Sequence, residues 1–464
     1  MKKTLTLALC ATALIACEKK EYCSNDPNAA PDASTCYAVQ DYGRTYKHFF
    51  QPKNAWVGDP MPFYDNGKFH IFYLCDQRPA PATFHPWYSA TTTDLVNYTD
   101  NGEAIPCGAD GSHEDALGTG SVFKDGNTYY AFYTGHNGDL DPKEIIYWAT
   151  STDLKTWTKD TQHFFRAPDG YDRNEFRDPI VFKEGNAYKM LLSTRADIGS
   201  GVWKGVVAQF TSTDLKNWTK DPNTPFFYTD PSAFMVECPD VFTQGNYQYL
   251  IFSNIEESVR RVQYRYRRVG DKNWITPAQQ DLDDRVFYAG KTATDGTHRY
   301  IWGWNPSRIN YEDNSAYHWG GSLAVHELTQ NSDGTLNVKM PTAFDSKQAV
   351  SASLGSISLD NNTRVFDRLS SGFNKIVAKI KANTATEFGV MFGACGNLYE
   401  TYRVTLNLNK GELQLNRVIR DGGTATINSI KLPVNANKEY TVKIVQEGSA
   451  AAIYVNDVVA LSIR

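Results

Sequence analysis

Three acidic side chains stand at matching places beside a proline, and carboxylates arranged in this way can carry acid–base and nucleophilic chemistry. They occur in three short segments: Gly58-Asp59-Pro60, Arg177-Asp178-Pro179 and Glu237-Cys238-Pro239. In each segment a phenylalanine follows the proline by three residues. Asp59, Asp178 and Cys238 are therefore equivalent positions, and Glu237 lies one place earlier.

Carboxylates that meet in one cleft repel each other, and repulsion together with partial burial drives their pKa values apart. One group can then keep a proton as an acid while another stays ionised as a nucleophile or base. Hydrolysis of a glycosidic bond requires such a pair. The alternative is that Asp-Pro only caps a turn, but three occurrences in register, one with a glutamate, favour the chemical interpretation.

An internal repeat of close to 60 residues indicates how these segments are positioned. A Thr-Asp-Leu phrase that leads to an aromatic residue occurs at 93–98, 152–157 and 213–218. A second phrase, two aromatic or apolar strands around a turn with glycine, is typical of a hairpin. It occurs at 63–74, 123–134, 182–194, 242–254 and, more loosely, 289–304.

Five hairpins with almost no helical periodicity predict an all-β chain, in which residues 40–335 form a five-bladed β-propeller. A solenoid of stacked sheets is the alternative. The first strands of propeller blades line a central channel, so the three carboxylates are expected to converge on one funnel. Beyond Trp319 tryptophan is absent, and alternating strands predict a C-terminal β-sandwich over residues 345–464.

The segments that hold the carboxylates resemble the signature blocks of glycoside hydrolase family 32, the β-fructofuranosidases that include levanases, inulinases and invertases. The resemblance rests first on Trp56-Val57-Gly58-Asp59-Pro60, Phe176-Arg177-Asp178-Pro179 and Glu237-Cys238-Pro239. Further similar motifs are Trp87 before the first Thr-Asp-Leu, Gly118-Thr119-Gly120-Ser121, Phe287-Tyr288-Ala289, Trp302-Gly303-Trp304 and Trp319-Gly320-Gly321. Together they span residues 50–330, and a C-terminal sandwich is also found in the family.

The resemblance implies a role for each carboxylate. Asp59 would be the nucleophile that attacks the anomeric carbon of a fructosyl unit, Glu237 the general acid and base, and Asp178 the stabiliser of the transition state. Retention would follow, with the two key carboxyl groups about 5 to 5.5 Å apart. The substrate-binding candidates are Trp56, Trp87, Ser121, Arg177, Gln77 and Trp304. The tryptophans have an alternative role as core residues.

The chain departs from the family pattern close to Asp59. Gly58 replaces the usual asparagine, Met61-Pro62 replaces Asn-Gly, and Leu74 stands where a glutamine is expected, although Gln77 is nearby. Because these positions normally contact the terminal sugar, the preferred substrate is open between levan, inulin, fructo-oligosaccharides and sucrose. Two other functions also stay open: an inverting family 43-like arabinofuranosidase or xylosidase, and a carbohydrate-binding lipoprotein without catalysis.

The first residues predict export. Lys2 and Lys3, an apolar run and Leu14-Ile15-Ala16-Cys17 resemble a bacterial lipoprotein signal, so residues 1–16 would be removed and Cys17 would carry lipid. An ordinary secretory signal is the alternative. Residues 17–39 would form a leader, in which Cys23 and Cys36 could form a disulfide. We expect a lipid-anchored monomer of the outer membrane or cell surface, or of the periplasmic face.

Composition excludes other partners. With 47 basic and 52 acidic residues the net charge is −5, without long blocks of one sign, which argues against binding to nucleic acid. No cofactor motif was found, and the widely spaced cysteines do not predict a zinc site. Asp139-Leu140-Asp141 and residues 281–284 are acidic, but solvated loops explain them better than a calcium site.

Overall fold

The computed structural model describes residues 46, 48–77, 85–256, 259–309, 315–346, 353, 355–360, 362–363, 373–395, 400–418 and 424–464. The predicted signal at 1–16, Cys17, and the leader at 17–39 with its cysteines lie outside the described residues. Within the described ranges the chain is nearly all-β, and its helix α2 (Ala343–Ser346) has a single turn. In that part of the chain, no helix is long and apolar enough to span a membrane.

The strands before residue 340 fall into five consecutive antiparallel groups. The first comprises β1 (Trp56–Asp65), β2 (Lys68–Asp76), β3 (Trp87–Thr92) and β4 (Thr99–Ile105), and the second β5 (Ala116–Asp125), β6 (Thr128–His136), β7 (Glu144–Ser151) and β8 (Thr158–Lys159). The third comprises β9 (Tyr171–Glu184), β10 (Ala187–Asp197), β11 (Trp203–Ser212), β12 (Thr219–Lys220) and β13 (Phe227–Tyr228). The fourth holds β14 (Val236–Gln244), β15 (Tyr247–Asn254) and β16 (Arg261–Arg268), and the fifth β17 (Tyr288–Thr294), β18 (Arg299–Arg308), β19 (Tyr317–Gln330) and β20 (Leu336–Lys339).

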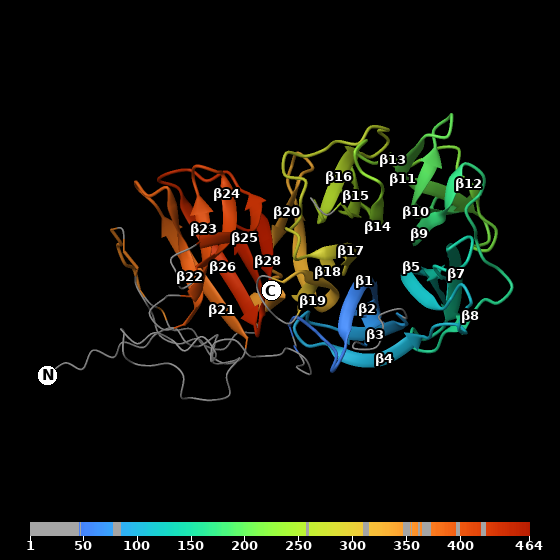
Figure 1. Ribbon diagram of the computed structural model, residues 1–464, viewed down its shortest axis with the longest axis horizontal. Coiled ribbons are helices and arrows are strands. Elements are labelled where there is room, and N and C mark those ends of the chain that lie inside the picture. Colours follow the sequence, from blue (N-terminus) through green and yellow to red (C-terminus); the bar gives the residue numbers. More distant parts are fainter. Residues whose placement is uncertain are drawn as a thin grey trace.

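The first strands of the five groups contact one another in a closed order. β1 contacts β5, β5 contacts β9, β9 contacts β14, β14 contacts β17, and β17 returns to β1. Figure 1 shows these five strands around a common centre, with the later strands of each group farther out. The five predicted hairpins are confirmed as β1–β2, β5–β6, β9–β10, β14–β15 and β17–β18.

The first and fifth groups differ from the five separate sheets expected from the repeat. β19 pairs with β1 at Gly321 and Val57, which joins these groups into one eight-stranded sheet. Gly321 lies so close to the β18 backbone that a Cβ there would be 1.7 Å from the Asn305 carbonyl oxygen. A glycine is therefore needed where β19 passes between its two neighbours.

The Thr-Asp-Leu phrase of the repeat has a structural function. In each copy the aspartate carboxylate accepts hydrogen bonds from backbone N–H groups two and three residues later, at Asp94, Asp153 and Asp214. The leucine that follows is buried and has a positive φ of 62° or 63°, at Leu95, Leu154 and Leu215. These aspartates therefore cap tight turns between strands, and the repeat reflects turn chemistry here.

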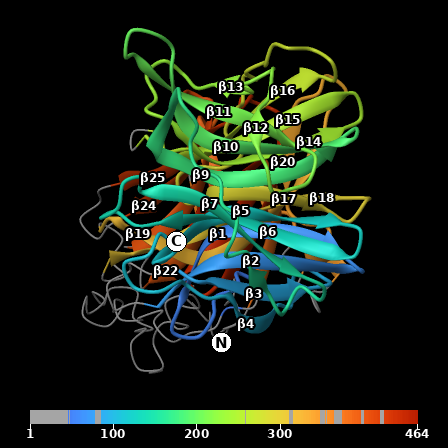
Figure 2. The same ribbon diagram turned by 90° about the vertical axis from the view of Figure 1, so that its right-hand side faces the viewer.

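Residues after 373 form two four-stranded antiparallel sheets. One has the order β21 (Asn374–Lys381), β26 (Glu439–Glu447), β27 (Ala450–Val455), β28 (Val459–Ile463), and the other β22 (Glu387–Cys395), β23 (Glu400–Asn407), β24 (Glu412–Val418), β25 (Thr424–Lys431). Apolar side chains of both sheets, such as Leu413 and Ile453, share one buried cluster. The sheets therefore pack face to face as a β-sandwich, which lies to one side of the first five groups in Figure 1 and behind them in Figure 2.

A buried polar cluster joins the sandwich to the first five groups. The Asp283 carboxylate accepts hydrogen bonds from the Ser462 backbone N–H at 2.8 Å and from the Ser462 hydroxyl at 2.6 Å. His326 Nε2 lies 2.9 Å from the same carboxylate, and its Nδ1 lies 2.9 Å from the Tyr454 hydroxyl. All four side chains are almost completely buried. The two parts of the chain therefore share polar as well as apolar contacts.

Candidate active site

A β-bulge at the same level of each central strand sets the direction of the candidate site residues. In all five hairpins two residues of the first strand oppose one residue of the second, at 59–60, 118–119, 178–179, 238–239 and 289–290. The leading residue has a positive φ of 36° at Asp59, 61° at Asp178 and 51° at Cys238. Non-glycine residues seldom adopt this conformation, and bulges often redirect side chains at functional sites.

Asp59 is held by hydrogen bonds to both of its carboxylate oxygens. The Thr119 hydroxyl donates to Oδ2 at 2.5 Å, and the Trp304 indole N–H donates to Oδ1 at 2.8 Å. Burial raises the pKa of Asp59, and the nearby charge of Glu237 raises it further, whereas both hydrogen bonds lower it. The carboxylate is therefore fixed in orientation and lies within electrostatic reach of Glu237.

Glu237 faces two donors on other strands. Arg177 Nη2 lies 3.2 Å from its Oε1, and the Tyr288 hydroxyl donates to its Oε2 at 2.8 Å. Arg177 is held in turn by Glu144 at 3.2 Å and by Glu175 at 2.5 Å. The Glu237 side chain is 26% exposed, which leaves it accessible to a ligand from the solvent side.

Asp178 is the most deeply buried of the three carboxylates, with 3% of its surface exposed. Its Oδ2 accepts the backbone N–H of Cys238 at 2.7 Å, and its own N–H donates to the Thr134 hydroxyl at 3.0 Å. Burial raises the pKa of Asp178 to about 7, opposed by Arg177 and reinforced by Glu237. The site thus holds three carboxylates that repel each other in a largely dehydrated space.

This arrangement can cleave an acetal or glycosidic bond. Asp59, fixed by two donors, can attack a carbon, while Glu237, at the solvent side, can exchange a proton with a leaving group or water. Asp178 lies on β9, which stands between β1 with Asp59 and β14 with Glu237 in the order β1, β5, β9, β14 of the first strands. Within the described ranges, no three His, Cys, Asp or Glu side chains are arranged to hold a metal ion.

Two of the predicted substrate-binding residues, Trp87 and Ser121, take part in packing between strands. Trp87 is fully buried in an apolar cluster, where its indole N–H donates to the Gly118 carbonyl oxygen at 3.0 Å. Ser121 uses its hydroxyl to accept the backbone N–H of Val181 at 3.1 Å, in the contact between β5 and β9. Both side chains therefore stabilise packing, and contact with a sugar stays a prediction for them.

The other predicted residues divide between the site and its surroundings. Trp304 is fully buried and contributes its N–H to Asp59, so it positions this carboxylate and does not form an exposed sugar platform. Arg177 positions the Glu237 carboxylate in the same way. Trp56 is 3% exposed at the start of β1. Gln77 is exposed and donates to the Tyr88 hydroxyl at 3.1 Å, so contact with substrate stays a prediction for it.

The unusual residues near Asp59 have structural explanations. A Cβ at Gly58 would lie 2.1 Å from Cη2 of Trp319, so the indole occupies the space of a side chain at position 58. Trp319 is half-buried and stacks on His85, with ring centres 4.3 Å apart. Met61 and Leu74 are buried with other apolar side chains. An apolar ring thus replaces a polar side chain beside Asp59.

Sequence reasoning missed several residues of the site. Tyr288, Thr119 and Trp319 occur in the motifs noted above, but no role was assigned to them. Tyr288 precedes the bulge of the fifth hairpin, as Glu237 precedes that of the fourth. Aligning all five hairpins by their bulges, instead of the three that contain proline, would have identified it.

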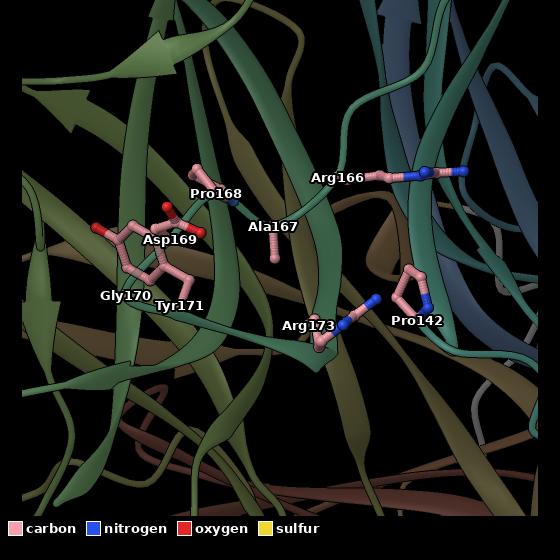
Figure 3. A pocket seen from close by; sticks show the side chains of 8 residues that line it. All are labelled: Pro142, Arg166, Ala167, Pro168, Asp169, Gly170, Tyr171 and Arg173. Atoms are coloured by element: carbon pink, nitrogen blue, oxygen red, sulfur yellow. The ribbon is translucent and has the colours of Figure 1, made fainter. Parts of the chain in front are cut away.

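A cavity of about 230 Å³ lies outside the carboxylate site, at the loop that leads into β9. Arg166, Tyr171, Arg173 and Pro142 are among its lining residues, and Figure 3 shows the Arg173 side chain directed toward Pro142, with the Arg166 side chain passing above it. Arg173 is already paired with Asp141 at 3.2 Å. Since none of the three carboxylates lines it, this cavity is distinct from the candidate active site.

Comparison with known proteins gives a consistent result. Residues 48–339 match the family described as "Glycosyl hydrolases family 32 N-terminal domain". The chain is 25% identical to the raffinose invertase of Escherichia coli over 442 residues, which cover 89% of this chain and 88% of that protein. Among solved structures, sucrose-6-phosphate hydrolase from Lactobacillus gasseri superposes with a TM-score of 0.71, at 21% identity, over 92% of this chain and 88% of that one. Fructan 1-exohydrolase IIa from Cichorium intybus, in complex with 1-kestose, superposes with a TM-score of 0.72, at 17% identity, over 92% of both chains.

Proposed function

The chain belongs to glycoside hydrolase family 32, and on this basis we propose that it is a retaining hydrolase that cleaves β-fructofuranosyl linkages in fructans, fructo-oligosaccharides and sucrose. Activity on fructosides follows from the family and its invertase relative. The observation that carries the mechanism is the pairing of a fixed, partly buried Asp59 with a more exposed Glu237. The inverting family 43-like alternative is not favoured by these matches.

The proposed reaction has two steps. An Asp59 carboxylate oxygen forms a bond to the anomeric carbon as the bond to the leaving oxygen breaks, and Glu237 transfers its proton to that oxygen. A water molecule then attacks the same carbon, gives its proton to Glu237 and releases Asp59. Two inversions at one carbon yield net retention. Thr119 and Trp304 support this role, since they orient Asp59 for attack.

Asp178 is proposed to stabilise the oxocarbenium-like transition state and to accept hydrogen bonds from sugar hydroxyls. A negative charge beside the developing positive charge lowers the barrier most where water is excluded. Its burial and its fixed hydrogen bond from the Cys238 N–H support this role. Arg177 and Tyr288 hold the Glu237 carboxyl group in the same position before and after it transfers its proton.

The finer points of architecture and location are also proposals. The closed order of contacts among the five central strands supports a five-bladed β-propeller over residues 40–335, followed by a sandwich domain at 345–464. We further propose that residues 1–16 are a signal, that Cys17 is lipidated, and that the mature protein is an exported, surface-exposed monomer. Gln77 and Trp56 remain candidate contacts to the sugar.

The test combines two site variants with product analysis. Asp59→Asn and Glu237→Gln should each abolish release of fructose or fructo-oligosaccharides from sucrose, inulin and levan. Asp65→Asn, which changes an aspartate at the far end of the same strand β1, should keep most activity. NMR of the first-formed anomer should show retention. Inversion, or nearly full activity in Asp59→Asn, would remove Asp59 as nucleophile, and binding of fructans without any turnover would favour the non-catalytic alternative.

A further inference from the structure

Four exposed apolar side chains gather at the solvent end of the third group of strands, and together they are called the apolar rim. Ile198, Val202 and Trp203 lie at the tip of the β10–β11 hairpin, and Phe234 precedes β14. Their exposed fractions are 52%, 54%, 39% and 42%. Large apolar side chains that remain this exposed together often mark a binding surface.

The two aromatic residues of the apolar rim lie over the same face of the third group. Alternate residues of a strand share a face of the sheet, so Trp203 and Gly205 of β11 lie on the same face. The Phe234 carbonyl oxygen lies 2.7 Å from the position of a Cβ at Gly205, which places this segment directly over β11. Arg195, the partner of Gly205 on β10, has its guanidinium 4.3 Å from the centre of the Phe234 ring.

The position of the apolar rim relates it to Glu237 more than to Asp59. Phe234 lies three residues before Glu237 on the segment that enters β14. On the neighbouring group, Ser193 of β10 pairs with Arg177, which binds Glu237, and Asp197 lies four residues farther toward the hairpin tip and pairs with Trp203. The rim thus continues outward from the side of the site that holds the proton donor.

From this geometry we propose that the apolar rim binds sugar units on the leaving-group side of a fructose oligomer. This inference rests on the proposed function, in which Glu237 protonates the leaving group. Flat aromatic faces pack against the C–H faces of sugar rings. Arg195 is fixed by the Phe234 ring and by Asp172 at 3.5 Å, so its remaining N–H groups can donate to hydroxyls. Asp197, opposite Trp203, lies four strand residues or about 13 Å beyond Ser193, opposite Arg177, whereas sucrose has only one sugar ring beyond the bond that is cleaved.

A second copy of this chain is a less suitable occupant. Stable protein interfaces bury about 800 Å² on each partner, and four side chains that are each about half exposed supply roughly half of that area. An oligosaccharide needs a narrower track of a few rings.

The experiment compares short and long substrates in rim variants. Trp203→Ala, Phe234→Ala and the double variant should leave kcat/KM for sucrose within about twofold of wild type. For inulin-type oligosaccharides of four or more units the double variant should lose about tenfold, mainly through KM, because binding of remote units is removed. Val377→Ala removes a similarly exposed side chain from β21 in the sandwich and is the matched control.

Each outcome decides the inference. A selective loss on long substrates in folded variants, with Val377→Ala unchanged, supports it. Equal losses on sucrose and oligomers, no loss on either, or a concentration-dependent dimer that Trp203→Ala disrupts would overturn it. If wild type hydrolyses sucrose but not oligomers, the rim inference fails while the proposed function stands. If wild type hydrolyses neither, the proposed function itself fails.

Discussion

Two regions of this molecule enclose carboxylates, and they do so in opposite ways. At the centre of the first five groups, Asp59 and Asp178 lie within electrostatic reach of each other and of Glu237, and burial raises the pKa of both aspartates. At the junction with the sandwich, Asp283 meets the imidazole of His326 and two donors of Ser462. One region brings carboxylates together against each other, and the other supplies each buried carboxylate with donors, as it also does for the neighbouring Asp284.

The difference indicates which region serves the reaction and which region stabilises the fold. Carboxylates that repel each other in a dehydrated space destabilise the folded chain, so such a cluster indicates a function that requires it. A carboxylate and its donors stabilise the junction only when all of them are present. Removal of one partner leaves another buried polar group without its hydrogen bond. Substitutions in the two regions should therefore have opposite effects on activity and stability.

The largest expected effect is on activity at the centre. Asp59→Asn keeps the shape of the side chain but removes the proposed nucleophile, so kcat should fall by about 10⁴-fold or more. The melting temperature should stay the same or rise, because a buried charge is removed. Steady-state kinetics on sucrose and thermal unfolding of the same sample measure both. A large drop in melting temperature would show that Asp59 stabilises the fold, and the contrast between the regions would be lost.

The largest expected effect on stability is at the junction. Asp283→Asn disrupts a buried set of hydrogen bonds with His326 and Ser462, and the free energy of unfolding should fall by about 3 to 5 kcal/mol. Activity per folded molecule should be close to wild type, because the hydrogen bonds of Asp283 go to His326 and Ser462 and not to the three carboxylates. Chemical denaturation gives the change in stability. Ser462→Ala, which removes only the hydroxyl, should cost less than Asp283→Asn, and the reverse order would contradict this account.

The pH dependence of the free energy of unfolding tests the same contrast at Asp178. Burial raises its pKa from 3.8 to about 7, so between these values the folded chain holds a proton that the unfolded chain has released. Stability should therefore fall as pH rises through this window, by up to about 1.4 kcal/mol per pH unit. Asp178→Asn should remove this part of the slope, and the variant should be more stable than wild type at pH 8. Unfolding measured from pH 4 to 8 tests this, and an unchanged slope would count against it.

The same group should affect the activity of the wild type. If Asp178 acts as an ionised stabiliser, kcat/KM should decline as pH falls below about 7, since the group becomes protonated in the free enzyme.

The repeat allowed much of this site to be predicted, because equivalent positions in equivalent hairpins lie at the same level of adjacent strands. The convergence of Asp59, Asp178 and Glu237 follows from that register. The exposure of the tryptophans does not, since Trp87 is buried against β5 and β6, whereas Trp319 lies half-buried over Gly58 and His85.

Contacts between residues distant in sequence were equally beyond prediction. Glu144 binds Arg177 from a strand of the preceding group, 33 residues earlier, and no local pattern marks it. The pairing of β1 with β19 depends on a glycine at a single crossing. Such features arise only when the groups close on one another, whereas turns and hairpins are encoded within a few residues.

Substitution of Lys291 has the smallest expected effect on activity, and it tests directly how the carboxylates of the central site are stabilised. This lysine is 2% exposed on β17, and its ammonium donates to the Gly120 carbonyl oxygen at 2.9 Å, one residue from Thr119, which binds Asp59. Its positive charge lowers the pKa of Asp59 and so opposes burial and Glu237. Lys291→Met should therefore raise the pKa of Asp59 and move the acid limb of the kcat/KM profile to higher pH.

The expected loss in Lys291→Met is about tenfold in kcat/KM at pH 5, with little change at pH 8, because Asp59 must be ionised to attack. Lys189→Met is the matched control, since Lys189 is also largely buried and pairs with Asp221 at 2.5 Å, in the outer part of the third group. It should lower stability without moving the pH profile. A parallel loss at both pH values in Lys291→Met would mean that Lys291 only supports packing, and the central carboxylates would then depend on burial and hydrogen bonds alone.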